Sequence, residues 1–279
     1  MKKKFLFPFL CFILLLLIGI GLMLYPLISN WYGERVRSTV EVQYNEAIAK
    51  LEDESIREAF RAAQEYNESL YSVQLDPAAA VDEYDSLLNL SGNGIMGYVE
   101  IPVIDVKVPI YHYTTEESLQ KGAGHLFGSS LPVGGENTHC ILSAHRGLPS
   151  AKLFTDLNLV EKGDVFYLHV LDRTLAYEVD QILTVLPEET ESLAIKDGAD
   201  YVTLITCTPY AVNTHRILVR GHRISVENAK EIQKTEQKAT GITNPTGPML
   251  ALCVAVGIVI AVILVAAVNY IQNRKQHRK

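Results

Sequence analysis

The chain has 279 residues, of which 48% are hydrophobic, and its formal net charge at pH 7 is −7. An acidic chain lacks the basic surface that nucleic-acid binding requires, so nucleic acid is excluded as a partner. Four cysteines are too few for a disulfide-stapled scaffold, and no H-E-x-x-H or paired C-x-x-C spacing is present, so we expect neither a metal nor a cofactor.

Two charge-free apolar runs lie near the ends of the chain. Residues 5–28 (FLFPFLCFILLLLIGIGLMLYPLI) and residues 249–268 (MLALCVAVGIVIAVILVAAV) are each long enough to cross a bilayer as a helix. Lysines in residues 1–4 precede the first run, and a basic tail, residues 269–279, follows the second. The positive-inside rule therefore predicts a cell-membrane protein with two spans, both termini in the cytoplasm and the middle outside.

The alternative for the first run is a cleaved signal peptide. The run is long for a signal peptide, and the following YPLISNWYG offers no A-x-A-like cleavage site, which favours a retained anchor. Seven of the 25 Lys and Arg residues flank the two runs, so the segment between them carries 18 basic against 32 acidic residues, about −14. This charge fits an exported, well-solvated domain.

Residues 29–71 show the periodicity of an extracellular helical stalk. Apolar residues recur three and four positions apart between 33 and 70. Ser55 and Glu58 have the spacing of a capping box, which predicts that a second helix begins there. We expect two helices that pack on the following domain, with a membrane-adjacent coiled coil as the alternative.

Residues 95–226 are rich in short β-strand signals. The runs are IMGYVEIP, VKVPIYHY, NTHCILSAH, DVFYLHV, LAYEVDQILTV, YVTLITC and RILVRGHRI. They predict a mainly β domain of roughly eight strands, closed or nearly closed into a barrel around one core. Residues 72–94 before it are expected to form a loop with a little helix, and residues 227–248 after it a polar linker to the second apolar run.

Two cysteines, Cys140 and Cys207, lie outside the apolar runs. Cys140 falls in the middle of a strand signal and is expected to be buried, whereas Cys207 stands at the end of one, where a side chain can meet solvent. The alternatives are a disulfide between the two, or Cys207 as a small core residue.

A cysteine nucleophile needs neighbours that favour its thiolate and a donor that stabilises the oxyanion. His145 ends one strand signal, and Arg216 begins another, after a loop of eight residues that follows Cys207. A hairpin would place Cys207 and Arg216 at one rim of the barrel, and His145 would join them if its strand runs parallel to that of Cys207. The histidines that compete as bases are His112, His125, His139, His169, His215 and His222, of which His215 is the strongest because it adjoins Arg216.

The segment TLITC, residues 203–207, resembles the TLxTC signature of the sortases, the cysteine transpeptidases of Gram-positive cell surfaces. SAHRG, which contains His145, and RILVRG, which begins at Arg216, resemble the histidine and arginine segments of that family in the same order. The resemblance covers roughly residues 95–226. It implies an eight-stranded sortase-type β-barrel with N-terminal helices, flanked by two transmembrane helices.

The resemblance also implies a role for each residue. Cys207 is the nucleophile that attacks the carbonyl between Thr and Gly of an LPxTG-like sorting signal and forms a thioacyl enzyme. His145 is the general acid and base, and Arg216 holds the substrate and the oxyanion.

Two features resemble class C, the pilin-polymerising sortases: the second apolar run, and a lid-like loop at 72–94 that contains Asp76 and Pro77. In the class C lid, the aspartate contacts the catalytic arginine and an aromatic residue after the proline covers the cysteine. Ala78 stands in that place here, and a methyl group does not cover a thiol as a ring does. The alternative is that Asp76 and Pro77 form an ordinary turn.

Three functions follow for comparison. A pilus-assembling sortase joins the sorting signal of one pilin to a lysine amine of the next. A housekeeping sortase transfers surface proteins to a cell-wall precursor amine instead. The third alternative is a non-catalytic membrane scaffold, against which the complete Cys, His and Arg set argues.

Overall fold

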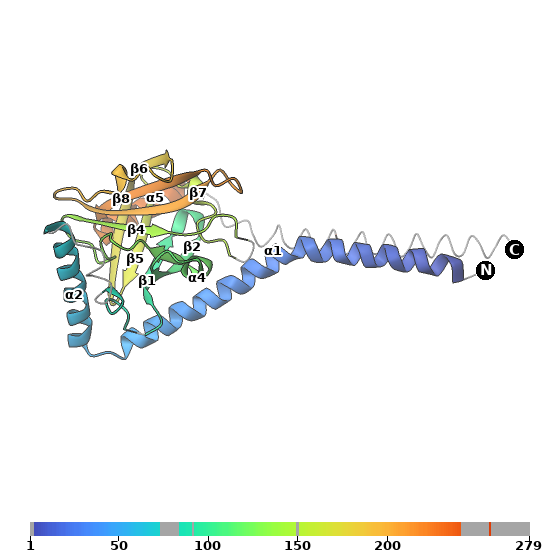
Figure 1. Ribbon diagram of the computed structural model, residues 1–279, viewed down its shortest axis with the longest axis horizontal. Coiled ribbons are helices and arrows are strands. Elements are labelled where there is room, and N and C mark those ends of the chain that lie inside the picture. Colours follow the sequence, from blue (N-terminus) through green and yellow to red (C-terminus); the bar gives the residue numbers. More distant parts are fainter. Residues whose placement is uncertain (1–2, 73–83, 91, 149–150, 241–256, 258–279) are drawn as a thin grey trace. The chain divides into compact units, whose positions relative to one another are not determined.

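The computed structural model describes residues 3–72, 84–90, 92–148, 151–240 and 257 (Figure 1). The chain divides into two compact units, Met1–Gln233 and Lys234–Lys279, and the fold and site described below belong to the first. The lid residues named above (Asp76, Pro77 and Ala78) and the second apolar run apart from Gly257 lie outside the described residues.

Within the described ranges, two helices precede the eight strands, a short one lies between the second and third strands, and one follows the last strand. The helices are α1 (Lys3–Ala49), α2 (Asp53–Ser72), α4 (Glu116–Lys121) and α5 (Val226–Thr240), with short 3₁₀ turns η1 (Pro102–Ile104), η2 (Leu157–Leu159) and η3 (Glu191–Leu193). The strands are β1 (Ile95–Ile101), β2 (Val106–His112), β3 (Ala123–His125), β4 (Thr138–Ser143), β5 (Val165–Val170), β6 (Arg173–Val185), β7 (Asp200–Thr208) and β8 (His215–Ile224).

The eight strands close into one barrel in the order β1-β2-β3-β4-β7-β8-β6-β5. Neighbouring strands are antiparallel except for β2–β3 and β4–β7, which are parallel. Each of the seven strand signals in the sequence forms a strand, which confirms the predicted closed, mainly β barrel. The eighth strand, β3, is the short segment Ala-Gly-His, which has no strand pattern of its own.

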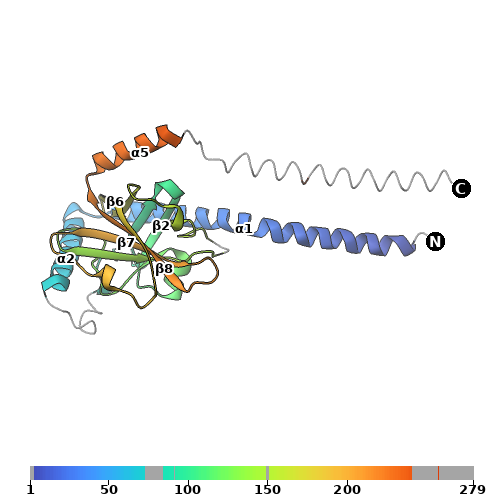
Figure 2. The same cartoon turned by 90° about the horizontal axis from the view of Figure 1, so that it is seen from above.

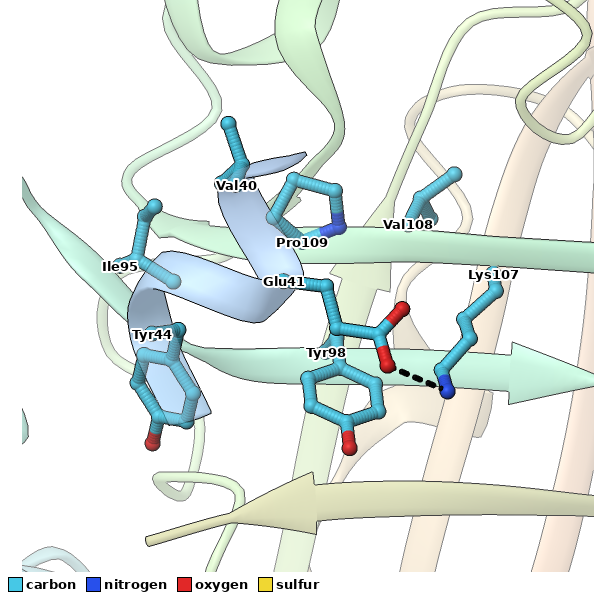
Figure 3. Close-up of a pocket in the computed structure, with 8 residues that line it drawn as sticks. All are labelled: Val40, Glu41, Tyr44, Ile95, Tyr98, Lys107, Val108 and Pro109. Atoms are coloured by element: carbon cyan, nitrogen blue, oxygen red, sulfur yellow. Dashed lines mark ion pairs between the residues drawn. The ribbon is translucent and has the colours of Figure 1, made fainter. Parts of the chain in front are cut away.

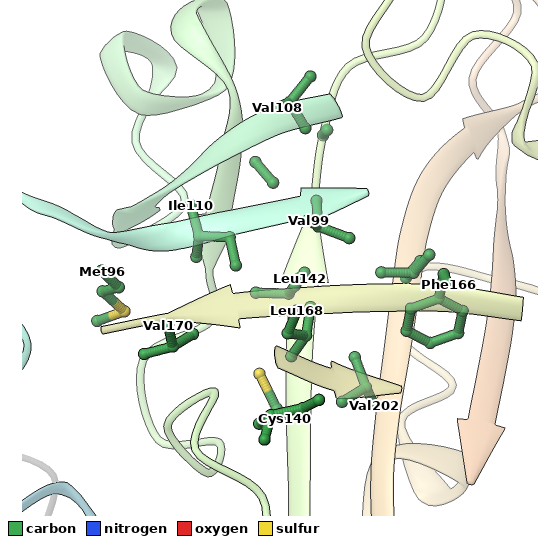
Figure 4. Close-up of a cluster of buried hydrophobic side chains, with 14 of the residues drawn as sticks. Met96, Val99, Val108, Ile110, Cys140, Leu142, Phe166, Leu168, Val170 and Val202 are labelled. Atoms are coloured by element: carbon green, nitrogen blue, oxygen red, sulfur yellow. The ribbon is translucent and has the colours of Figure 1, made fainter. Parts of the chain in front are cut away.

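The barrel interior is filled by apolar side chains from all sides. Figure 4 shows Met96 and Val99 of β1 gathered with Leu142 of β4 and Leu168 of β5. Cys140 lies in the same cluster with 2% of its surface exposed, and burial raises the pKa of its thiol well above the ordinary value. The structure therefore confirms Cys140 as a buried core residue with a free thiol.

Alternation along β7 decides which of its side chains reach the outside. Val202 and Leu204 belong to the core, and in a strand the intervening residues point to the opposite face. Ile205 and Cys207 therefore lie on the outer face of the barrel wall.

The last part of α1, from about Val40, and helix α2 lie against the outside of the barrel (Figure 1 and Figure 2), which confirms the prediction of two helices that pack on this domain. Tyr44 and Ile48 of α1 are buried against the barrel, as the three-and-four spacing requires. Helix α2 begins at Asp53, two residues before Ser55, so the predicted capping box does not mark its start.

An ion pair ties α1 to the barrel beside these apolar contacts. Figure 3 shows the carboxylate of Glu41 facing the ammonium of Lys107 on β2. The distance from Glu41 Oε1 to Lys107 Nζ is 2.7 Å. The same ammonium lies 4.6 Å from the centre of the Tyr98 ring, a cation–π contact. The pair lines a small hollow between α1 and the β1–β2 hairpin, so the helix is held there by charge as well as by packing.

Replacing Tyr44 with phenylalanine is expected to lower the free energy of unfolding by about 1–3 kcal/mol. The buried Tyr44 hydroxyl donates to the Met96 carbonyl (3.0 Å) and accepts from the Leu171 N–H (2.9 Å), so its removal leaves both groups without a partner. Chemical denaturation of the purified chain measures the change. Tyr71→Phe is the matched control, because the Tyr71 hydroxyl bonds an exposed carboxylate, and it is expected to cost less than about 0.5 kcal/mol. Equal losses in the two variants would contradict the prediction.

His125 of β3 is completely buried beside Tyr84. The Tyr84 hydroxyl lies 2.7 Å from His125 Nδ1, and His125 Nε2 lies 2.8 Å from the Ser130 carbonyl, which fits a neutral ring that accepts at Nδ1 and donates at Nε2. Burial lowers the pKa of His125 from 6.5 to about 4.

The folded chain is therefore expected to lose stability as the pH falls from about 6.5 to about 4. The unfolded state binds a proton on this histidine within that window while the folded state does not, which removes up to roughly 3 kcal/mol. Denaturation midpoints at several pH values measure the effect. A His125→Gln variant should show a flatter dependence on pH, and an unchanged slope in that variant would refute the assignment.

Helix α5 occupies most of residues 227–248, which are predicted above to form a polar linker. Its first turns pack on the barrel wall, where Ala229 is buried in a small cluster with Val165 and Tyr167 of β5 and Ala176 of β6. The segment as a whole is polar, but Val226, Ala229 and Ile232 give the helix one apolar face that packs on the barrel. None of the helices in the described part of the chain combines the length and the apolar character of a membrane span.

Candidate active site

The parallel pair β4–β7 brings the strand that leads to His145 alongside the strand that carries Cys207. Ser143 is the register partner of Ile205, and the Ala144 N–H donates to the Ile205 carbonyl just beyond it (3.1 Å). The same register, continued to the end of β7, places His145 beside Cys207. The parallel direction of β4 and β7 is the condition under which His145 is predicted to join Cys207 and Arg216 at one rim of the barrel.

The hairpin β7–β8 supplies the third residue. Cys207 and Arg216 are direct partners in this antiparallel pair, and direct partners point to the same face of a sheet. The Arg216 Nη1 atom donates to the carbonyls of Asn213 and His215, both at 3.0 Å, which draws the guanidinium toward the loop that joins the two strands. His145, two residues beyond the end of β4, thus falls in one row with Cys207 of β7 and Arg216 of β8.

Cys207 and the His145 side chain are both partly buried. Cys207 is a half-buried free thiol, so no disulfide joins it to Cys140. The His145 side chain is 29% exposed, and its Nε2 atom lies 3.5 Å from Oε1 of Glu116 in the first turn of α4. The Nε2 atom itself is buried and has no hydrogen-bond partner among the described residues.

Glu116 is a neighbour of the site that sequence reasoning missed. It precedes another glutamate, Glu117, which pairs instead with Lys121 at 2.7 Å. The two carboxylates look alike in the sequence, and only the packing of α4 beside β2 and β3 turns one of them toward His145.

The competing histidines lie elsewhere. His112, His125 and His139 are buried and hydrogen-bonded, and His169 contacts the Glu100 carboxylate (2.9 Å). His215 is the register partner of Thr208, so by alternation it faces away from the side that Cys207 occupies. His222 pairs with Tyr201 at the other end of β7. Of the seven histidines among the described residues, His145 is therefore the one that the register places beside the thiol.

The same outer face continues away from the catalytic row. The next row consists of Ser143, Ile205, Leu218 and Leu183, one from each of β4, β7, β8 and β6. Two residues further, Arg220 of β8 forms a bidentate pair with Asp180 of β6, at 2.9 and 2.8 Å. Leu218 and Arg220 of these two rows are almost fully buried. Among the described residues, no group of three or more His, Cys, Asp or Glu side chains is arranged to hold a metal ion.

Comparison with known proteins agrees with this geometry. The family model of the sortase domain matches residues 99–224. The solved structure of sortase C1 from Streptococcus agalactiae is 44% identical, with a TM-score of 0.64, and the similarity covers 67% of this chain and 98% of that one. Sortase C from Clostridium perfringens, solved with the C-terminal cell wall sorting motif, is also 44% identical, with a TM-score of 0.60 and coverage of 68% and 100%.

A curated relative, sortase A of Listeria monocytogenes, is 27% identical over 85% of this chain and 96% of its own length. The identity to the two class C structures is higher, at 44%, and the similarity covers 98% and 100% of those chains. The likeness is therefore one of sequence as well as of fold. These matches confirm the resemblance first read from TLITC and SAHRG. The chain belongs to the sortase family and is a class C-like cysteine transpeptidase.

Proposed function

We propose that this sortase cleaves an LPxTG-like sorting signal between Thr and Gly and joins the threonine to a lysine amine of a pilin subunit, building covalent pili. The row formed by His145, Cys207 and Arg216 carries the proposal, because it gathers a thiol, a base and a cation at one end of the barrel. The class C relatives support the choice of donor and acceptor: one was solved with a sorting motif, and another, from Streptococcus pneumoniae, is described in terms of pilin substrate specificity.

In this reaction the Cys207 thiolate attacks the threonine carbonyl, and a C–S bond forms. The C–N bond to glycine breaks as His145 donates a proton to the leaving amine. The lysine amine then attacks the thioester, His145 accepts its proton, and the C–S bond breaks to restore the thiolate. Arg216 donates to the oxyanion of both tetrahedral intermediates, because its guanidinium stays charged and presents planar donors.

A mass-spectrometric experiment tests the donor half of the reaction. The full-length chain in detergent is incubated with an LPxTG-like peptide, and Cys207 is expected to gain the mass of the fragment that ends at threonine. Hydroxylamine should release that fragment as a hydroxamate. Failure to form any adduct, also in an Asp76→Ala variant, would favour the non-catalytic scaffold.

A second candidate differs only in the acceptor. The match to a sortase A over most of this chain supports a housekeeping enzyme that transfers to a cell-wall precursor amine. Competition between a pilin-derived lysine peptide and a precursor amine for the same thioacyl enzyme separates the two. We expect the lysine peptide to have the higher kcat/KM, and the reverse preference would select the housekeeping function.

Asp76 is proposed to restrain the enzyme through a polar tie to Arg216. Asp76→Ala is then expected to raise the rate at which a small alkylating reagent labels Cys207 several-fold, because loosening the tie increases the population open to the reagent. An Asp85→Ala variant, in the described part of the same loop, serves as the control. Unchanged labelling in Asp76→Ala would argue against the restraint.

Membrane attachment through residues 5–28 and 249–268 also remains a proposal. In support, α1 exposes large apolar side chains such as Leu14, Leu15 and Leu22, which suit a lipid surface better than water. Protease treatment of intact protoplasts is expected to digest the barrel and to leave both termini protected. Digestion of a C-terminal tag from outside would reject the second span.

A further inference from the structure

His145 lies just beyond the last register pair of β4 and β7, so the strand ladder alone does not fix its place beside Cys207. The final pair is Ser143 with Ile205, and β4 ends there. A proton-transfer residue must nevertheless be held within about hydrogen-bond reach of the reacting groups. Some other contact has to set this spacing.

Two side-chain hydrogen bonds bracket the catalytic pair. Before it, the Thr206 hydroxyl donates to the Ala144 carbonyl (2.8 Å). After it, Nη1 of Arg146 donates to the Thr208 hydroxyl (3.0 Å). The residues on either side of His145 are thereby bonded to the residues on either side of Cys207.

Arg146 also anchors the loop in which it lies. Its Nε atom donates to the Thr155 carbonyl (3.1 Å), and its Nη2 atom donates to the Asn158 side-chain oxygen (2.6 Å). One planar guanidinium therefore joins both sides of the β4–β5 loop to the end of β7. A lysine, with a single ammonium, does not reproduce three donors in fixed directions.

The residue after Arg146 is a glycine, and the backbone conformation and the close contact at this position both favour glycine. Gly147 has φ +75°, and a Cβ atom there would lie 2.6 Å from the ring of Tyr210, which follows Cys207 on the β7–β8 loop. The Gly147 N–H donates to the Thr155 hydroxyl (3.0 Å), and the Phe154 N–H donates to the His145 carbonyl (3.2 Å). Close approach of Tyr210 thus depends on glycine at this position.

We propose that Arg146 is a positioning residue that holds His145 against Cys207 by bridging to Thr208. The proposal rests on the roles suggested above for Cys207 and His145. Thr208 and Cys207 are neighbours in β7, so their side chains face opposite sides of the sheet. Arg146 bonds the Thr208 hydroxyl, on the side away from the thiol. It therefore acts by holding His145 in place and does not contact the substrate.

The test uses the full-length chain and the hydroxylamine assay. Thr208→Val removes the accepting hydroxyl with almost no change of shape, and Thr208→Ser keeps it. We expect Thr208→Val to lower kcat by about ten- to a hundredfold with KM within about twofold, because a small displacement of a catalytic group has effects of that size. Thr208→Ser should recover most of kcat, and all three proteins should share one thermal midpoint within a few degrees.

A double-mutant cycle with Arg146→Met, which keeps the aliphatic stem, measures whether the two residues act together. If Arg146 works through Thr208, the double variant loses little more kcat than the worse single variant. Equal kcat in Thr208→Val and wild type, fully additive losses, or a Thr208→Ser variant as slow as Thr208→Val would each overturn the proposal. A wild-type chain that forms no adduct on Cys207 would instead reject the proposed function.

Discussion

Replacing Cys207 with alanine is expected to abolish the thioacyl adduct and to lower transfer at least about a thousandfold, because no other group can form the covalent intermediate. The variant should still bind the peptide, since the outer face of β4, β7 and β8 remains intact. Intact-mass analysis after incubation with peptide, together with hydroxamate release, measures the loss.

Cys140 provides the matched control within the same chain. Its thiol is buried in the core and its pKa is raised well above the ordinary value, so it is neutral and inaccessible to substrate. Cys140→Ala is expected to lower the free energy of unfolding by about 1–3 kcal/mol and to keep the adduct at temperatures where the chain stays folded. An adduct that persists in Cys207→Ala and disappears in Cys140→Ala would reverse the assignment of the nucleophile.

Replacing Arg216 with alanine is expected to lower kcat by about 10²- to 10³-fold, which is the usual effect of removing one oxyanion donor. Arg216→Lys should recover only part of the loss, because an ammonium keeps the charge but not the planar pair of donors. Alkylation of Cys207 by iodoacetamide passes through no oxyanion, so its rate should change far less than kcat. Steady-state kinetics and labelling rates of the same preparations give both numbers.

Arg220 is the control that shows whether the loss of activity is specific to Arg216 or follows from removing any arginine on β8. It lies on the same face of the same strand, where it pairs with Asp180. Arg220→Lys is expected to alter KM or stability with kcat largely retained. If Arg216→Ala raised KM alone and left kcat unchanged, Arg216 would be a substrate-binding residue without a part in the transition state.

The accuracy of the strand predictions follows from local chemistry. Seven strands carry β-branched or aromatic residues in runs that favour extended backbone, and all seven form. Strand β3 has only alanine, glycine and histidine, and it is a strand because β2 and β4 offer hydrogen bonds on its two sides. Helix α5 was overlooked for a related reason: a few apolar residues on one face pack on the barrel, while the segment as a whole is polar.

The sequence by itself determined the β-rich class, the two helices before the barrel, and a thiol, an imidazole and a guanidinium in an order that resembles the sortases. Only the tertiary structure decided that β4 runs parallel to β7, which brings His145 to Cys207, and that His215 faces away. It also decided that Glu116 and Arg146 adjoin the pair. Local propensities act over a few neighbouring residues, whereas strand order and register depend on contacts between segments roughly sixty residues apart, and those contacts form only when the barrel closes.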